Sequence, residues 1–226
     1  MRKIWEERCM KYDAVLFDFD YTLGDATEAI YAGFVHGLTT MGYPKPDLEA
    51  VRGTIGMVVT EAYALLTGDH RPEEGQRFYS LFHPMARDLQ AQGAVKLFPG
   101  AHELLKALKE QGAKTAIVST KNMDSLHAIL GNTGIGDLVD QVVGGGMGLP
   151  SKPDPQGTLL ALEQLGVDRT RALYCGDTII DAKTARNAGV DFCAVLNGTT
   201  PAGDFGAYPH VHIAPDLAEL KDWLGI

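Results

Sequence analysis

Two aspartates separated by one residue follow an apolar run near the start of the chain. The run covers residues 14–17, and the acids are Asp18 and Asp20. Side chains alternate between the two faces of an extended chain, so both carboxylates are expected on one face. Adjacent carboxylates repel each other unless a cation or a proton lies between them. Such a pair alone is most simply a solvated strand end, but this pair is accompanied by further polar groups.

Three more polar groups each follow an apolar, strand-like run. They are Ser119 with Thr120, then Lys152 after a run of three glycines, and finally Asp177 with Asp181. In an open parallel sheet, ligands bind outside the carboxyl ends of the strands. The sequence therefore predicts that these side chains converge with Asp18 and Asp20 at one edge of a sheet.

In order and spacing, these groups resemble the four signatures of the haloacid dehalogenase-like (HAD) superfamily of phosphohydrolases. The resemblance extends from Tyr12 over nearly the whole remaining chain. Four ordered motifs are far more specific than a single motif. An aspartate at position 20 is absent from the dehalogenase branch of that superfamily, so phosphate chemistry is favoured over carbon-halogen cleavage.

The residues themselves suggest a two-step hydrolysis. A carboxylate near a divalent cation can attack an anionic phosphate and form an aspartyl-phosphate. We assign Asp18 as the nucleophile and Asp20 as the general acid and base, which protonates the leaving oxygen and then activates water. Ser119, Thr120 and Lys152 are predicted to bind the phosphate through hydroxyl and ammonium donors.

Mg²⁺ is the expected cofactor, because this hard cation is usually held by one or two carboxylates together with substrate phosphate and water. The resemblance implies that Asp18 and Asp177 are direct ligands, with the backbone carbonyl of Asp20 as a third. Thr22 and Asp181 are assigned supporting roles behind these ligands. For Asp181, a helix-capping role competes with ligation, since it lies at the expected start of a helix.

Position 21 departs from the family pattern, which usually has glycine there. Tyr21 is expected either to narrow the site, to face the inserted region, or simply to pack at the base of the loop. Residues 144–146 are three glycines before the lysine loop, but they lack the Gly-Lys-Ser/Thr ending of a P-loop. We interpret these glycines as a flexible connection.

The elements that must position these residues form an α/β fold. After residue 97 helical and strand-like patterns alternate, which predicts a doubly wound parallel-sheet, Rossmann-like core. Residues 25–96 show helical periodicity and no convincing strand. Two apolar stripes recur at helical spacing, one formed by Ile30, Phe34, Leu38 and Met41 and the other by Phe78, Leu81, Phe82, Met85 and Leu89. We therefore predict a core of residues 1–24 and 97–226 and a helical cap of residues 25–96, with hinges near residues 24–25 and 97–100.

Composition narrows the class of partner. The 226 residues are 45% hydrophobic and carry a formal net charge of -9, which argues against nucleic acid and favours a small phosphorylated metabolite. Three scattered cysteines, Cys9, Cys175 and Cys193, show no metal-binding spacing and are expected to be passive in a reducing cytoplasm. No membrane span or signal-peptide core is found, and a monomer or homodimer is expected. Met10 is an alternative start to Met1.

Substrate identity is the least constrained feature. Residues 52–56 look like the substrate-facing turn of phosphoglycolate phosphatase-type members, and the candidate cap contacts are Arg52, Thr54, His36 and His83. Our first hypothesis is a Mg²⁺-dependent phosphatase acting on a phosphoglycolate-like acid, a sugar phosphate or a nucleotide. The alternatives are a phosphomutase of the beta-phosphoglucomutase type and a phosphate-sensing binding module.

Overall fold

A six-stranded parallel sheet forms the centre of the molecule. The computed structural model describes residues 10–226, so Cys9 and the choice between Met1 and Met10 as the start lie outside the described residues. The strand order is β5-β4-β1-β6-β7-β8, and every neighbouring pair is parallel. The strands are β1 (Ala14–Phe17), β4 (Lys114–Asn122), β5 (Gln141–Gly145), β6 (Ala172–Gly176), β7 (Asp191–Val195) and β8 (His212–Ala214).

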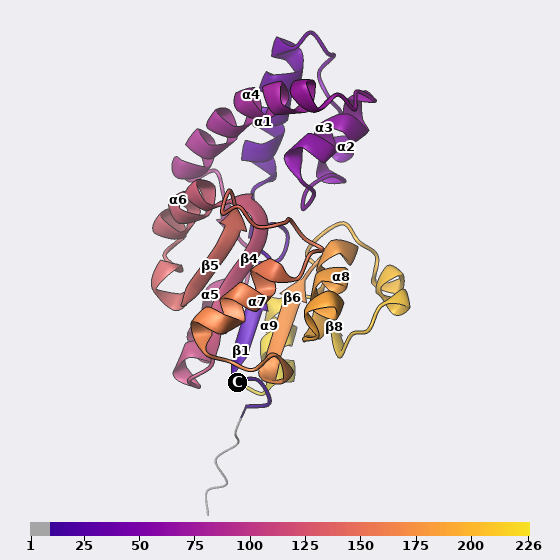
Figure 1. Ribbon diagram of the computed structural model, residues 1–226. Coiled ribbons are helices and arrows are strands. Elements are labelled where there is room, and N and C mark those ends of the chain that lie inside the picture. The colour runs from indigo at the N-terminus through magenta and orange to yellow at the C-terminus, as the bar shows by residue number, and fades with distance from the viewer. Residues whose placement is uncertain (1–9) are drawn as a thin grey trace, which may run out of the picture.

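Helices cover both faces of this sheet (Figure 1). On one face lie α5 (Ala101–Glu110), α6 (Met123–Thr133) and α9 (Leu217–Leu224). On the other face lie α7 (Gln156–Leu165) and α8 (Ile179–Ala188). The chain also forms short 3₁₀ helices at η1 (Gly136–Leu138), η2 (Arg169–Arg171) and η3 (Ala202–Ala207). In β1, Val15 and Phe17 face the first layer, whereas Ala14 and Leu16 face the second. A strand buried on both faces reads as a continuous apolar run, and the predicted doubly wound α/β fold is confirmed.

The inserted region is a group of four helices beyond the sheet edge at which β4 and β5 end (Figure 1). They are α1 (Thr27–Thr40), α2 (Leu48–Arg52), α3 (Val59–Thr67) and α4 (Pro72–Ala91). Two short antiparallel strands, β2 (Gly24–Asp25) and β3 (Lys96–Leu97), pair where the chain enters and leaves this group. This ribbon lies at the predicted hinges, and the division into core and cap domains stays a prediction. We call the four helices the cap.

Aromatic rings fill the space between α1 and α4. The ring centroid of Phe34 lies 5.1 Å from those of both Phe78 and Phe82. Gly33 and Gly37 allow this close approach, because a Cβ at either position would lie less than 3 Å from the Phe82 or Phe78 ring. The predicted stripes therefore pack against each other through these phenylalanines. The side chain of Met85, in contrast, is 37% exposed, because the buried face of α4 continues through Ala86 instead.

One interpretation of the glycine run was wrong. Gly144 and Gly145 belong to β5, where a Cβ would lie 2.7 Å from the backbone oxygens of Lys121 and Thr120, respectively. These glycines permit close strand pairing and do not form a flexible connection.

Two remaining features concern the cysteines and the possibility of a membrane span. Cys175 and Cys193 are free and buried, and burial raises the pKa of the Cys175 thiol well above its usual value. A thiol that resists ionisation is a poor nucleophile, as a passive role requires. Among the helices of residues 10–226, none combines the length and the apolar character needed to cross a membrane.

Candidate active site

Three carboxylates meet at the carboxyl ends of β1 and β6, which are neighbours in the sheet. Asp18 directly follows β1, Asp177 directly follows β6, and Asp181 lies in the first turn of α8. One carboxylate oxygen from each lies within 4.8 Å of the others, and all three residues are buried. The parallel register that pairs Phe17 with Cys175 places the first two acids side by side. The predicted convergence of these residues is thus present in the structure.

Lys152 provides the positive charge beside this cluster. Its Nζ lies 3.1 Å from Asp18 Oδ1 and 2.6 Å from Asp181 Oδ1, and its side chain is only 5% exposed. Burial alone would lower the pKa of Lys152, but Asp18 and Asp181 outweigh that effect and hold the pKa well above its usual value. Lys152 is therefore a permanent cation that offsets part of the negative charge.

The negative charges of the carboxylates still repel one another despite this lysine. Burial raises the pKa of Asp18 to about 6; Lys152 opposes the rise, while Asp181 and Asp20 add to it. Burial also raises the pKa of Asp177 well above its usual range, with the charges of Asp181 and Asp18 adding to the effect. A site with this excess of negative charge gains stability from a bound cation.

The oxygen atoms available at the site suit such a cation. Oδ1 of Asp20 is buried and has no hydrogen-bond partner within residues 10–226, and the buried Oδ1 of Asp18 has only the charge of Lys152 beside it, at 3.1 Å. Gly198 leaves room beside Asp177, because a Cβ there would lie 2.0 Å from Asp177 Oδ2. Mg²⁺ prefers oxygen ligands and is often held by only one or two carboxylates. The residues present thus fit the ion expected from the sequence.

Asp181 has less capacity for direct ligation than its neighbours. Its Oδ2 accepts hydrogen bonds from the backbone N–H (3.0 Å) and the hydroxyl (2.6 Å) of Thr178. The backbone N–H of Asp181 donates in return to Thr178 Oγ1 at 3.3 Å, which completes a capping box at the start of α8. Asp181 Oδ1 accepts from Lys152. Asp181 therefore caps the helix and contacts the lysine, and its supporting role behind the metal ligands stays a prediction.

Asp20 lies beside a second lysine that the sequence analysis did not assign. Lys121 Nζ is 3.1 Å from Asp20 Oδ2, and both side chains are less than a tenth exposed. The available signal was that Lys121 follows Ser119 by two residues in the same strand, which favours a position on the same face. Each of the two paired aspartates thus has its own lysine.

The remaining predicted residues occupy different places around the cluster. The Ser119 side chain forms a hydrogen bond with Asp18 and so opposes part of the rise that burial causes in the pKa of Asp18. Thr22 is buried and donates a hydrogen bond of 3.2 Å to Asp177 Oδ1. The Thr120 hydroxyl donates instead to the backbone oxygen of Gly56 in the cap, at 3.1 Å. Its side-chain donor is therefore committed to a contact between core and cap.

Tyr21 faces the cap, which was one of the positions expected for it. Its hydroxyl lies 2.7 Å from Thr27 Oγ1 and accepts a hydrogen bond of 3.2 Å from Arg52 Nε. Tyr21 has φ of +56°, a left-handed conformation that costs a non-glycine residue about 1–2 kcal/mol. The tyrosine retains the tight turn that glycine usually makes, and uses its side chain to hold the first helix and the Arg52 turn of the cap.

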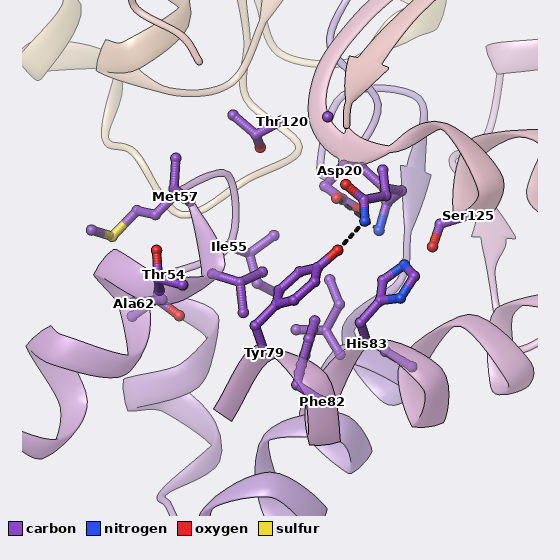
Figure 2. Close-up of a pocket in the computed structure, with 18 of the residues that line it drawn as sticks. Asp20, Thr54, Ile55, Met57, Ala62, Tyr79, Phe82, His83, Thr120 and Ser125 are labelled. Atoms are coloured by element: carbon purple, nitrogen blue, oxygen red, sulfur yellow. Dashed lines mark hydrogen bonds and ion pairs between the residues drawn. The ribbon is translucent and has the colours of Figure 1, made fainter. Parts of the chain in front are cut away.

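A cavity of about 360 Å³ extends from Asp20 into the cap. Figure 2 shows the Tyr79 ring among the side chains that line it, with Ile55 on one side and His83 on the other. Of the four candidate cap contacts, Thr54 and His83 line the cavity, whereas Arg52 and His36 are absent from its wall. The general acid proposed from the sequence therefore opens directly onto a space between the core and the cap.

Comparison with known proteins agrees with this geometry. The family model described as haloacid dehalogenase-like hydrolase matches residues 15–195. A protein named probable phosphatase IndB, from Dickeya dadantii, is 35% identical over 188 residues, covering 81% of each chain. A phosphoglycolate phosphatase of Rhodobacter capsulatus is 31% identical over 212 residues, covering 92% of this chain and 94% of its own.

Solved structures show the same architecture. A crystal structure of a haloacid dehalogenase-like hydrolase from Bacteroides fragilis superposes with a TM-score of 0.88 at 36% identity, covering 92% of this chain and 99% of its own. The residues matched by the family model include each of the carboxylates and lysines described above.

Proposed function

Because the chain belongs to the haloacid dehalogenase-like hydrolase family, we propose that it is a Mg²⁺-dependent phosphatase that hydrolyses a small phosphomonoester through a phospho-Asp18 intermediate. The observation that carries the proposal is the meeting of Asp18, Asp177 and Lys152 at one sheet edge, with Asp20 at the mouth of a cavity. Relatives named as phosphatases support this assignment.

In the first step, a carboxylate oxygen of Asp18 attacks phosphorus and the bond to the leaving oxygen breaks. Asp20 gives its proton to that oxygen, so the product leaves as a neutral alcohol. In the second step, Asp20 takes a proton from water, and the resulting hydroxide attacks phosphorus. Inorganic phosphate departs and the Asp18 carboxylate is restored. The same residue thus acts first as an acid and then as a base.

Charge on the transferring phosphoryl group is handled by the surrounding donors. Phosphoryl transfer spreads charge over the equatorial oxygens, so positioning and electrostatic stabilisation supply most of the rate. Lys152 and Ser119 would donate to these oxygens from their places beside Asp18. Mg²⁺ held by Asp18, Asp177 and the Asp20 carbonyl would screen the phosphate from the acids when bound.

The proposed setting is a cytoplasmic enzyme, monomeric or homodimeric, that acts on a small phosphorylated metabolite. The net charge of -9 opposes attraction to nucleic acid. A pyrophosphatase, PpaX of Bacillus velezensis, is also similar, at 29% identity over 94% of this chain, so pyrophosphate belongs among the candidate substrates.

The test is phosphate release from a panel of small phosphoesters, acetyl phosphate and pyrophosphate, each with Mg²⁺ and with a chelator. Asp18→Asn keeps the side-chain volume and removes the nucleophile, so it supplies the background. We expect Mg²⁺-dependent release by the wild type and none above background in the variant. Substantial Mg²⁺-dependent release by Asp18→Asn would refute the assignment of the nucleophile. An isomeric sugar phosphate appearing in place of free phosphate would identify a mutase.

A further inference from the structure

The cavity beside Asp20 marks the place of the leaving group. Asp20 and parts of β4, β5 and α6 line its core end, and the loop of residues 54–58 together with residues of α1, α3 and α4 lines the rest. If Asp20 protonates the leaving oxygen, the alcohol attached to that oxygen must extend into this space. The chemistry of the cavity wall therefore indicates the substrate class, an inference that rests on the proposed function.

Apolar atoms form most of the wall's surface, although polar side chains such as Thr60, Gln76 and Asn122 also line it. Its apolar side chains include Ile30, Phe34, Ile55, Val59, Ala62 and Phe82. The volume of about 360 Å³ falls within the range in which mostly apolar sites bind compounds the size of an aromatic ring or larger. A phosphorylated two-carbon acid would leave most of this apolar surface without contact.

Positive charge for a second anionic group is scarce. Among the described residues that line the cavity, Lys121 is the single lysine or arginine, and it is paired with Asp20 at 3.1 Å. His83 also lines the cavity, but its Nε2 lies 3.2 Å from Asp124 Oδ1. A carboxylate on the leaving group would be buried without a free cationic partner, which is costly. The wall therefore disfavours phosphorylated acids.

Gln90 places no polar requirement on the ligand. This residue lines the cavity and is 2% exposed, but its side-chain oxygen has almost no accessible surface and so does not face the cavity. The apolar surface and the lack of a free cation therefore indicate the substrate class. We propose that the substrate is the phosphomonoester of an uncharged, ring-sized apolar alcohol.

Three probe esters test this substrate class: phenethyl phosphate, its para-hydroxylated analogue and phosphoglycolate. We expect kcat/KM for the two aromatic esters to exceed that for phosphoglycolate by about tenfold or more, since apolar contacts of this size discriminate by that factor. Acetyl phosphate, which has no group large enough to reach the wall, reports on the chemistry alone. Release from acetyl phosphate combined with a preference for phosphoglycolate would overturn this inference and leave the proposed function standing.

Two wall variants sharpen the test. Ile55→Lys places a cation in the wall and should reduce the aromatic preference about tenfold while raising activity on phosphoglycolate, whereas the control Ile55→Leu should retain the preference.

Equilibrium binding gives a readout that does not depend on turnover. In Asp18→Asn protein with Mg²⁺, calorimetry should show phenethyl phosphate binding at least about tenfold more tightly than phosphoglycolate. Equal or weaker binding of the aromatic ester would overturn the inference even if no hydrolysis were seen. Absence of Asp18-dependent hydrolysis of every ester, together with tighter aromatic binding, would instead refute the proposed function and retain the cavity assignment.

Discussion

Replacing the nucleophile should make the metal-free protein more stable. Burial, together with the charges of Asp181 and Asp20, raises the pKa of Asp18 to about 6, even though Lys152 pulls in the opposite direction. The ionised carboxylate is therefore unfavourable in the folded state when no cation is bound. Asp18→Asn keeps the shape and removes the charge, so we expect the variant to unfold at higher denaturant concentration than the wild type in chelator.

The magnitude follows from the raised pKa. A rise from the ordinary 3.8 to about 6 corresponds to about 3 kcal/mol, because a tenfold change in the ionisation equilibrium is worth about 1.4 kcal/mol. A raised folded-state pKa contributes stability that is complete below the unfolded value and is lost as pH rises through the folded value. The advantage of Asp18→Asn should thus be absent below about pH 4, grow up to about pH 6 and stay constant above it.

Urea unfolding in chelator at about pH 4 and about pH 7.5 measures this difference. Asp13→Asn is the matched control, because a hydrogen bond from Arg171 lowers the pKa of the exposed Asp13. That control should gain no stability at either pH. The reasoning would be refuted if Asp18→Asn were less stable than the wild type at neutral pH. It would also be refuted if the free energy of unfolding of the variant exceeded that of the wild type by the same amount at both pH values.

Three further results are expected. Gly198→Ala should abolish Mg²⁺-dependent phosphate release, since its Cβ would lie 2.0 Å from Asp177 Oδ2, whereas Gly203→Ala, with open space around it, should behave as wild type. Lys121→Met should lower the free energy of unfolding by about 3 kcal/mol in urea, because it leaves the buried Asp20 charge without its partner; an unchanged midpoint would contradict this. Mg²⁺ should raise the unfolding midpoint of the wild type, and Asp177→Asn should reduce that rise; an equal rise in both would argue against Asp177 as a ligand.

The local sequence was sufficient for five of the six sheet strands and for most of the carboxylate cluster, but β8 and the β2–β3 ribbon were not predicted. Apolar runs of four or five residues predicted the buried strands, and the rule that strand ends converge brought Asp18 and Asp177 together. The glycine run was misread because close strand pairing and flexible loops share the same composition. Met85 was misplaced because helical periodicity gives a stripe but leaves its centre undefined by about one residue.

The sequence by itself determined the fold class and the acids and lysine at the sheet edge, because the alternation of side chains along a strand and the alternation of strands with helices are both visible in local sequence. Only the tertiary structure decided which lysine serves Asp20, that Thr120 and Tyr21 contact the cap, and that Ile55 and Phe82 line a cavity beside Asp20. These contacts join segments far apart in sequence, and they depend on how α1, α3 and α4 pack over the sheet edge. No local pattern encodes that packing, so the residues that select the substrate emerge only when the cap and the core are seen together.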